Sequence, residues 1–281
     1  MVDVGRVGIF SIELRNDERS AAGRIREAAA ELEELGYGAI WLGGNAGVHH
    51  AVPLLEATSR IVVATGILNI WEYDAADVAA RQKAVSAAHP GRFLLGLGAS
   101  HAGFVKGYQK PYSAMEGYLH RLDAAGAPPS ERVLAALGPR MLKLSRDHAA
   151  GAHPYLVTPE HTVRAREILG PDRLLAPEVK VVLETDPDRA RAIARRHLDV
   201  YLRLPNYTNN LLRLGFTEDD FAEGGSDRLI DATVAWGDLE AVRRRVAAHR
   251  EAGADHAALQ VLTDDGSGLP RDQWRDLAAV L

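Results

Sequence analysis

The chain has 281 residues, 47% hydrophobic and 25% charged, a composition typical of a globular protein with a sizeable core. Its formal net charge of -5 is spread without blocks of like charge, which argues against nucleic acid or an acidic membrane surface as a partner. The absence of cysteine excludes disulfides, thiolate metal sites and a cysteine nucleophile. The N-terminal residues lack a signal-peptide pattern and no apolar run reaches the roughly 18 residues of a membrane span, so we expect a cytoplasmic protein.

Short apolar runs rich in β-branched residues alternate with longer segments of helical periodicity. In the first half we expect strands at 6–11, 39–44, 61–68 and 92–98, and helices at about 19–35, 53–60, 77–88 and 111–126. In the second half we expect strands at 132–137, 152–157, 179–184 and 257–262, and helices within 138–151, at 159–170 and from 271. The stretch from about 187 to 252 is mostly helical, with interruptions near Gly215 and Gly224.

Eight strands separated by helices predict an all-parallel sheet, and eight is the number that closes a (β/α)8, or TIM, barrel. We therefore predict an α/β fold: a single domain over residues 1–281, with an extra helical segment between strands seven and eight. A doubly wound open sheet is the alternative. It usually carries GxGxxG after its first strand, and RVGIFSIELRND has no such loop.

In a TIM barrel the chemistry lies in the loops that follow the strands. Here those loops are polar but mostly uncharged, with no HxH or HExxH spacing, no GxSxG elbow and no persuasive pair of catalytic carboxylates. His49 and His50 are neighbours, and side chains at i and i+1 point in different directions, so we expect no metal site. A site with little formal charge suits a large planar cofactor that carries its own reactivity.

Three features fit such a cofactor. Gly66 interrupts the β-branched run IVVATGIL, where glycine marks either a bulge or the curvature of the barrel. The run GLGASH ends the fourth strand with small residues and then His101, either a proton-transfer group or a surface histidine. Gly138-Pro139-Arg140 opens a helix directly after strand five; the free N–H groups of such a start bind anions, although Gly-Pro also simply begins helices.

The segment IVVATGILNIWEYDAADVAARQKAVSAAHPGRFLLGLGASH, residues 61–101, resembles the bacterial luciferase-like oxidoreductases. The resemblance continues in GPRMLKLSRDHAAGAHPYLVTPEHTVRAREILGP at 138–171 and in VAWGDLEAVRRRVAAHREAGADHAALQVL at 234–262, so it covers most of the chain. Within the family, the chain is most similar to the branch that uses the deazaflavin coenzyme F420. The resemblance implies a TIM barrel with the flavin or deazaflavin across its C-terminal mouth, and a homodimer.

The resemblance also implies a set of site residues. Gly66 and Ile67 match a bulge in strand three, often with a cis non-proline peptide, that supports the back of the tricyclic ring, and Asn69 would bind the ring's polar edge. His101 is the predicted catalytic residue, as proton donor or acceptor, and Trp71 and Asn45 are candidates for substrate contact. The remaining predicted cofactor-binding residues are Gly98, Ala99 and Ser100 beside the ring, Leu137, Gly138, Pro139 and Arg140 on the phosphate side, and His153 and Tyr155 along the pocket.

One departure from the family concerns proton transfer. Some members place an Asp-His pair just after strand two, where this chain reads Gly43-Gly44-Asn45. We predict an F420-dependent oxidoreductase that transfers a hydride between the cofactor and a small organic substrate. Two alternatives stay open: an FMN-dependent luciferase-like monooxygenase, and a non-catalytic barrel that binds a cofactor or a partner subunit. A barrel acting on a sugar phosphate would use the same helix start, but the sequence offers no convincing carboxylate base for it.

Overall fold

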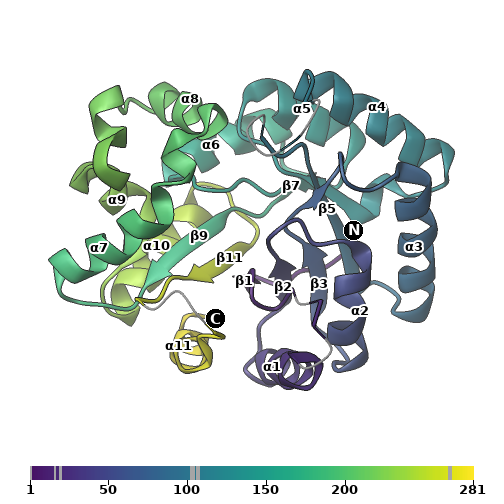
Figure 1. Cartoon of the computed structure of the whole chain (residues 1–281), viewed down its shortest axis with the longest axis horizontal. Helices are drawn as coiled ribbons and strands as arrows, with labels where there is room; N and C mark the ends of the chain where they lie inside the picture. Colours follow the sequence, from purple (N-terminus) through teal and green to yellow (C-terminus); the bar gives the residue numbers. More distant parts are fainter. Residues whose placement is uncertain (1, 16, 19–20, 102–104, 106–107, 265–267) are drawn as a thin grey trace.

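The computed structural model describes residues 2–15, 17–18, 21–101, 105, 108–264 and 268–281. Strands occupy the centre and helices surround them (Figure 1). The first half contains β1 (Val7–Ser11), α1 (Ala22–Glu34), β2 (Ala39–Leu42), α2 (Val48–Glu56), β3 (Val62–Thr65), β4 (Leu68–Asn69), α3 (Ala75–Ala88), β5 (Phe93–Gly98) and α4 (Pro111–Ala124). None of the helices in these ranges is long and apolar enough to cross a membrane.

The second half continues the alternation. It contains the 3-10 turn η2 (Pro129–Glu131), β6 (Arg132–Leu134), α5 (Pro139–His148), β7 (Gly151–Ala152), α6 (Pro159–Leu169), β8 (Leu174–Leu175) and β9 (Glu178–Val182). The segment between strands seven and eight holds α7 (Pro187–Leu198), η3 (Tyr201–Arg203), α8 (Pro205–Arg213), η4 (Glu218–Gly224), α9 (Asp227–Thr233), β10 (Val234–Trp236) and α10 (Leu239–Glu251). The last elements are β11 (Ala257–Val261), α11 (Arg271–Leu277) and η5 (Ala278–Val280).

The sheet is parallel and closes on itself, which confirms the TIM barrel. Its order is β10-β9-β11-β1-β2-β3-β5-β6-β7-β8, with β4 paired to β5. β8 and β9 are two pieces of one bent strand: β8 pairs with β7 at one end of the order, and β9 pairs with β11 near the other. The backbone N–H of Glu178 donates to the carbonyl of Pro154 at 2.8 Å, and that of Asp255 donates to the carbonyl of Leu175 at 2.9 Å, so both sides of the bend are bonded.

Both faces of the strands are buried, as expected for a parallel sheet covered by helices. Successive side chains point to opposite faces, so Phe10 packs in the apolar cluster inside the barrel while Ile9 packs in the larger cluster between strands and helices. The inner cluster also contains Trp41, Ala64 and Leu94. The interior is therefore a packed core, and space for ligands is left at the ends of the strands.

Two expectations about elements were wrong in detail, and one segment contains an additional strand. The sixth strand is only Gly151–Ala152, because Pro154 has no N–H to donate and Leu156 turns the chain with a φ of 55°. The helix expected at 53–60 spans 48–56, with Pro53 inside it. The 187–252 stretch is mostly helical, as expected, but it also contains the three-residue strand β10, which pairs with β9.

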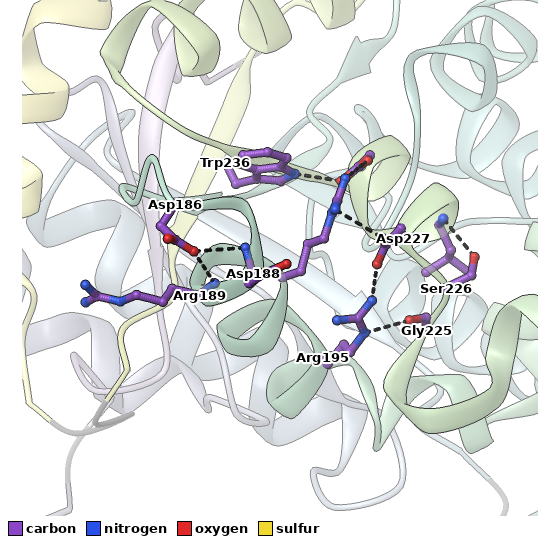
Figure 2. A network of polar contacts seen from close by, with 11 residues as sticks. Asp186, Asp188, Arg189, Arg195, Gly225, Ser226, Asp227 and Trp236 are labelled. Atoms are coloured by element: carbon purple, nitrogen blue, oxygen red, sulfur yellow. Dashed lines mark hydrogen bonds and ion pairs between the residues drawn. The ribbon is translucent and has the colours of Figure 1, made fainter.

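Charged contacts hold α7 against α9 in the extra helical segment (Figure 2). Arg191 reaches Asp231 through two hydrogen bonds of 3.0 and 2.7 Å and Asp227 at 3.0 Å. Arg195 pairs with the same Asp227 and donates to the carbonyl of Gly225 at 2.9 Å. Forked arginine–carboxylate contacts fix orientation as well as distance. They fix α7, one wall of a cavity described below.

Candidate active site

Strand three carries a bulge at its C-terminal end. Val63 and Ala64 pair with Phe93 and Leu94, but Leu68 pairs with Leu97, so three residues (65–67) stand opposite two (95–96) on β5. The hydroxyl of Thr65 donates to the carbonyl of Gly96 at 2.8 Å and accepts from its N–H at 2.9 Å, which replaces the interrupted ladder. Of the two interpretations of the glycine in IVVATGIL, the structure shows the bulge, and the Gly66–Ile67 peptide is cis, as the resemblance implied.

Glycines allow side chains to close in on this bulge. A Cβ added to Gly98 would lie 2.6 Å from Cγ1 and Cδ1 of Ile67. A Cβ added to Gly66 would lie 3.0 Å from the ring of Phe10 and 3.4 Å from Nε2 of His153. Gly98 therefore makes room for Ile67, and the bulge faces Phe10 and His153.

His153 is fixed as a neutral ring inside the barrel. It is 2% exposed and stacks on Trp41, with ring centroids 4.1 Å apart and planes 12° apart. Its Nδ1 lies 2.7 Å from the carbonyl of Ala176, which can only accept, so Nδ1 carries the proton. Burial lowers the pKa of His153 to about 4. Nε2 thus offers a lone pair toward the bulge, and it has no partner among the described residues.

His101 follows a turn at Ser100, whose φ is 52°. Its ring lies against Tyr207 of α8, with centroids 5.4 Å apart. Burial lowers the pKa of His101, while a hydrogen bond with Asn206 opposes part of the shift. The imidazole is therefore neutral at pH 7 and suited to accept a proton.

Asn45 and Asn69 share one carboxylate. Oε1 of Glu72 accepts from Nδ2 of Asn69 at 2.7 Å and from Nδ2 of Asn45 at 3.2 Å, and Oδ1 of Asn69 accepts from the Trp71 N–H at 3.3 Å. Asn69 is fully buried, so its amide supports the loop, and its contact with a ring edge stays a prediction. Sequence reasoning did not single out Glu72 as a site residue; a carboxylate three residues after Asn69 was the available signal.

Trp71 connects the loop after β4 to the loop after β5. Its indole Nε1 donates to the carbonyl of Ala99 at 2.7 Å, and its ring lies 5.6 Å from that of Tyr108. Ala99, Ser100 and the bulge are therefore held together on one side of the mouth. These contacts give Trp71 a structural role, and its contact with substrate stays a prediction.

Two arginine side chains, those of Arg140 and Arg213, belong to the surroundings of the start of α5. Gly138 is its N-cap, Pro139 its first residue, and no side chain caps it. A Cβ on Gly138 would find a single neighbour within 4 Å, Nη1 of Arg213 at 3.9 Å. The guanidinium of Arg140 lies over the ring of Tyr112 at 4.4 Å, and the carbonyl of Leu137 lies 2.9 Å from Nε2 of His161. Arg213 therefore lies beside a helix start that none of the described side chains caps, and anion binding there stays a prediction.

A buried ion pair lies inside the barrel beside Tyr155. Nζ of Lys180 is 2.8 Å from Oε2 of Glu178 and 3.6 Å from the centre of the Tyr155 ring. Burial raises the pKa of Glu178 and lowers that of Lys180. The Tyr155 hydroxyl donates to Oε1 of Gln260 at 2.8 Å. Sequence reasoning missed Glu178 and Lys180, although their alternation with valines places both on the inner face.

A cavity of about 440 Å³ opens beside Phe10, on the side of the mouth formed by β1, β11 and α7. Its polar wall includes His197 and Gln260, and its apolar wall includes Ile193. Burial and the charge of Lys180 lower the pKa of His197 to about 3, so this ring is neutral. Phe10 lines this cavity and also faces the bulge, so the cavity and the bulge share one wall.

The prediction that the side chains of His49 and His50 point in different directions is wrong. Their ring centroids lie 3.9 Å apart, and both face Asp17. At the first turn of α2 the two side chains fold toward the same loop, so neighbouring positions do not keep them apart.

Comparison with known proteins supports this architecture. A family model described as luciferase-like monooxygenase matches residues 6–126. No curated protein matches the chain. An F420-dependent secondary alcohol dehydrogenase, solved with an F420-acetone adduct, has a TM-score of 0.75 at 14% identity, over 99% of this chain and 98% of that chain.

Two further solved structures have the same fold. The coenzyme F420-dependent tetrahydromethanopterin reductase of Methanopyrus kandleri has a TM-score of 0.70 at 14% identity, over 97% of this chain and 96% of that one. The oxygenating constituent of 3,6-diketocamphane monooxygenase from Pseudomonas putida, in complex with FMN, has a TM-score of 0.71 at 12% identity, over 98% and 97%. Residues 6–126 are thus similar to the luciferase-like monooxygenases, and nearly the whole chain shares its fold with these solved structures.

Proposed function

We propose that this protein is an F420-dependent oxidoreductase that transfers a hydride between the deazaflavin and a small alcohol or its carbonyl product. One observation carries the proposal: the bulge at Gly66–Ile67 and the turn before His101 meet at the same side of the barrel mouth. Solved relatives of the same fold include two that use F420.

The residues present fit a planar ring with an anionic tail. Ile67, Ala99 and Ser100 would support the ring. The buried Nε2 of His153, which has no partner within the described part of the chain, supplies an acceptor that faces the bulge. The free N–H groups at Gly138 and the guanidinium of Arg213 would hold the negatively charged tail. Asn69 acts as a positioning residue through Glu72.

When bound, a deazaflavin exchanges a hydride at C5 and does not activate oxygen, so the protein must handle the matching proton. In alcohol oxidation, the substrate C–H bond breaks with its electron pair and the hydroxyl proton leaves. We assign that proton to His101, whose lowered pKa keeps its imidazole neutral and able to accept it. This assignment gives His101 the task that an Asp-His pair after strand two performs in some relatives.

FMN is the second candidate cofactor. The helix start at Gly138 would bind a single phosphate as well as the tail of F420, and an FMN-bound monooxygenase shares the fold. The two functions differ in their need for oxygen.

The test is turnover with each cofactor. Purified protein is mixed with oxidised F420 and a panel of small primary and secondary alcohols under argon, and loss of the deazaflavin absorbance is followed. We expect reduction of F420 by at least one alcohol, with no need for oxygen. Turnover only with reduced FMN and oxygen would replace the proposal with a monooxygenase, and no turnover in either arm would favour a non-catalytic barrel.

The homodimer, the cytoplasmic location and the single-domain assignment stay predictions.

A further inference from the structure

Three potential metal ligands meet near the barrel mouth, outside the site described above. Asp17 lies in the loop after β1, and His49 and His50 lie in the first turn of α2. Nε2 of His50 is 2.7 Å from Oδ1 of Asp17, and Nε2 of His49 is 3.9 Å from the same oxygen. One ligand atom from each residue lies within 4.8 Å of the others.

These distances are close to those of a bound ion. Ligands at about 2.0–2.1 Å from a tetrahedral zinc ion lie about 3.3 Å from one another. The side chain of His50 is 3% exposed, whereas those of His49 and Asp17 are 50% and 64% exposed. The side chains of His49 and Asp17 can therefore rotate about their own bonds to reach an ion held by His50, whose side chain is fixed by burial.

The fixed histidine also has the second contact that a metal ligand needs. Nδ1 of His50 now accepts the backbone N–H of Gly47 at 2.9 Å, and the carbonyl of Gly47 lies 3.3 Å from the same nitrogen. With a metal on Nε2, the ring proton moves to Nδ1. The hydrogen bond from the Gly47 N–H is then lost, and Nδ1 donates to the Gly47 carbonyl instead. Metal-binding histidines commonly donate their other N–H to a backbone carbonyl or a carboxylate.

A cavity of about 170 Å³ adjoins the cluster. Asp17, Glu18 and His50 form the polar part of its wall, and Leu14 and Leu54 belong to the apolar part. A water molecule occupies about 30 Å³ in the liquid, so the cavity has room for the waters that complete the coordination of an ion.

We propose that Asp17, His49 and His50 form a site for a divalent transition-metal ion, with zinc as the expected occupant. Two imidazoles and one carboxylate are ligands that zinc accepts, and three protein ligands leave one position for water. The ion would join the loop after β1 to the start of α2, so it would order one border of the barrel mouth. The inference is independent of the proposed reaction.

The test uses tag-free full-length protein. Isothermal titration with Zn²⁺ at pH 7.5 measures stoichiometry and affinity, and the visible absorption of added Co²⁺ reports whether the ligands form a tetrahedral set. We expect one ion per chain. The variants His49→Ala and Asp17→Asn should each weaken Zn²⁺ binding by at least tenfold and abolish the Co²⁺ spectrum.

A matched control is His120→Ala, which removes an exposed histidine of α4 whose ring faces His148. It should leave Zn²⁺ binding unchanged. Equal weakening in all three variants would show general surface binding and overturn the proposal, as would unchanged affinity in both His49→Ala and Asp17→Asn. Failure of the wild-type protein to bind Zn²⁺ at millimolar concentration would also overturn it.

Discussion

Adding one methyl group at Gly98 tests whether the bulge supports the cofactor. The new Cβ would lie 2.6 Å from two atoms of Ile67, well inside the 3.4 Å at which ordinary contacts begin. Ile67 has to move by nearly 1 Å, and it belongs to the bulge itself. Overpacking of this kind costs about 1–3 kcal/mol of stability. Because the same displacement tilts the support of the ring, we expect F420 affinity to fall by at least tenfold in Gly98→Ala.

The assay combines urea unfolding with F420 titration followed by fluorescence. Gly23→Ala is the matched control, because Gly23 lies in α1 and, outside its own helix backbone and chain neighbours, no described residue has an atom within 4 Å of the added methyl group. Alanine is favoured over glycine in a helix by up to about 1 kcal/mol, so the control should be as stable as wild type or more stable, with unchanged affinity. If Gly98→Ala behaves like this control, the close approach of Ile67 does not support the site.

Three further predictions concern buried and titrating groups. Lys180→Met leaves the carboxylate of Glu178 unpaired in the barrel, so it should lower the free energy of unfolding by about 3–5 kcal/mol. The double variant Lys180→Met/Glu178→Leu should recover this stability, and a small loss of stability in Lys180→Met alone would contradict a charged pair. The rate of alcohol oxidation should stay constant as pH falls to about 6.5, the ordinary pKa of histidine, and decline only below it, because burial lowers the pKa of His101. An unchanged rate in His101→Asn would show that this residue does not transfer the proton. His153 binds a proton below about pH 6.5 in the unfolded chain but only near pH 4 in the folded chain, so this residue lowers stability as pH falls between those values, by at most about 1.4 kcal/mol per pH unit. The free energy of unfolding of His153→Phe, measured in urea, should therefore depend less steeply on pH than that of the wild type. An equal slope in the two proteins would refute this prediction.

The barrel could be predicted because its signals are local. β-branched runs and helical periodicity located seven of the eight strands of the barrel, and the strand expected at 152–157 overlaps β7 by a single residue. The glycine inside IVVATGIL marked the position of the bulge but did not distinguish it from barrel curvature. The strands that escaped prediction, β8 and β10, have two and three residues, too few to show a period. Their pairing is decided by the neighbouring edges of β7 and β9, which are distant in sequence.

The site could be predicted less completely, because it depends on side-chain directions. The loops after the strands were correctly placed at the mouth, but the amide of Asn69 turned toward Glu72, and Trp71 toward a backbone carbonyl. The pair Glu178–Lys180 was readable from alternation along the strand, yet its partner Tyr155 comes from another strand end. For His49 and His50, the direction of each ring depends on Asp17, 32 or 33 positions earlier.

Cofactor choice is the central claim, and parallel binding titrations test it most directly. Tag-free protein is titrated with F420 and, separately, with FMN at the same pH and ionic strength. The account predicts saturable binding of F420 at one per chain, at least tenfold tighter than FMN, because the start of α5 and Arg213 attract the more highly charged tail. Saturation with FMN and no measurable binding of F420 would contradict it.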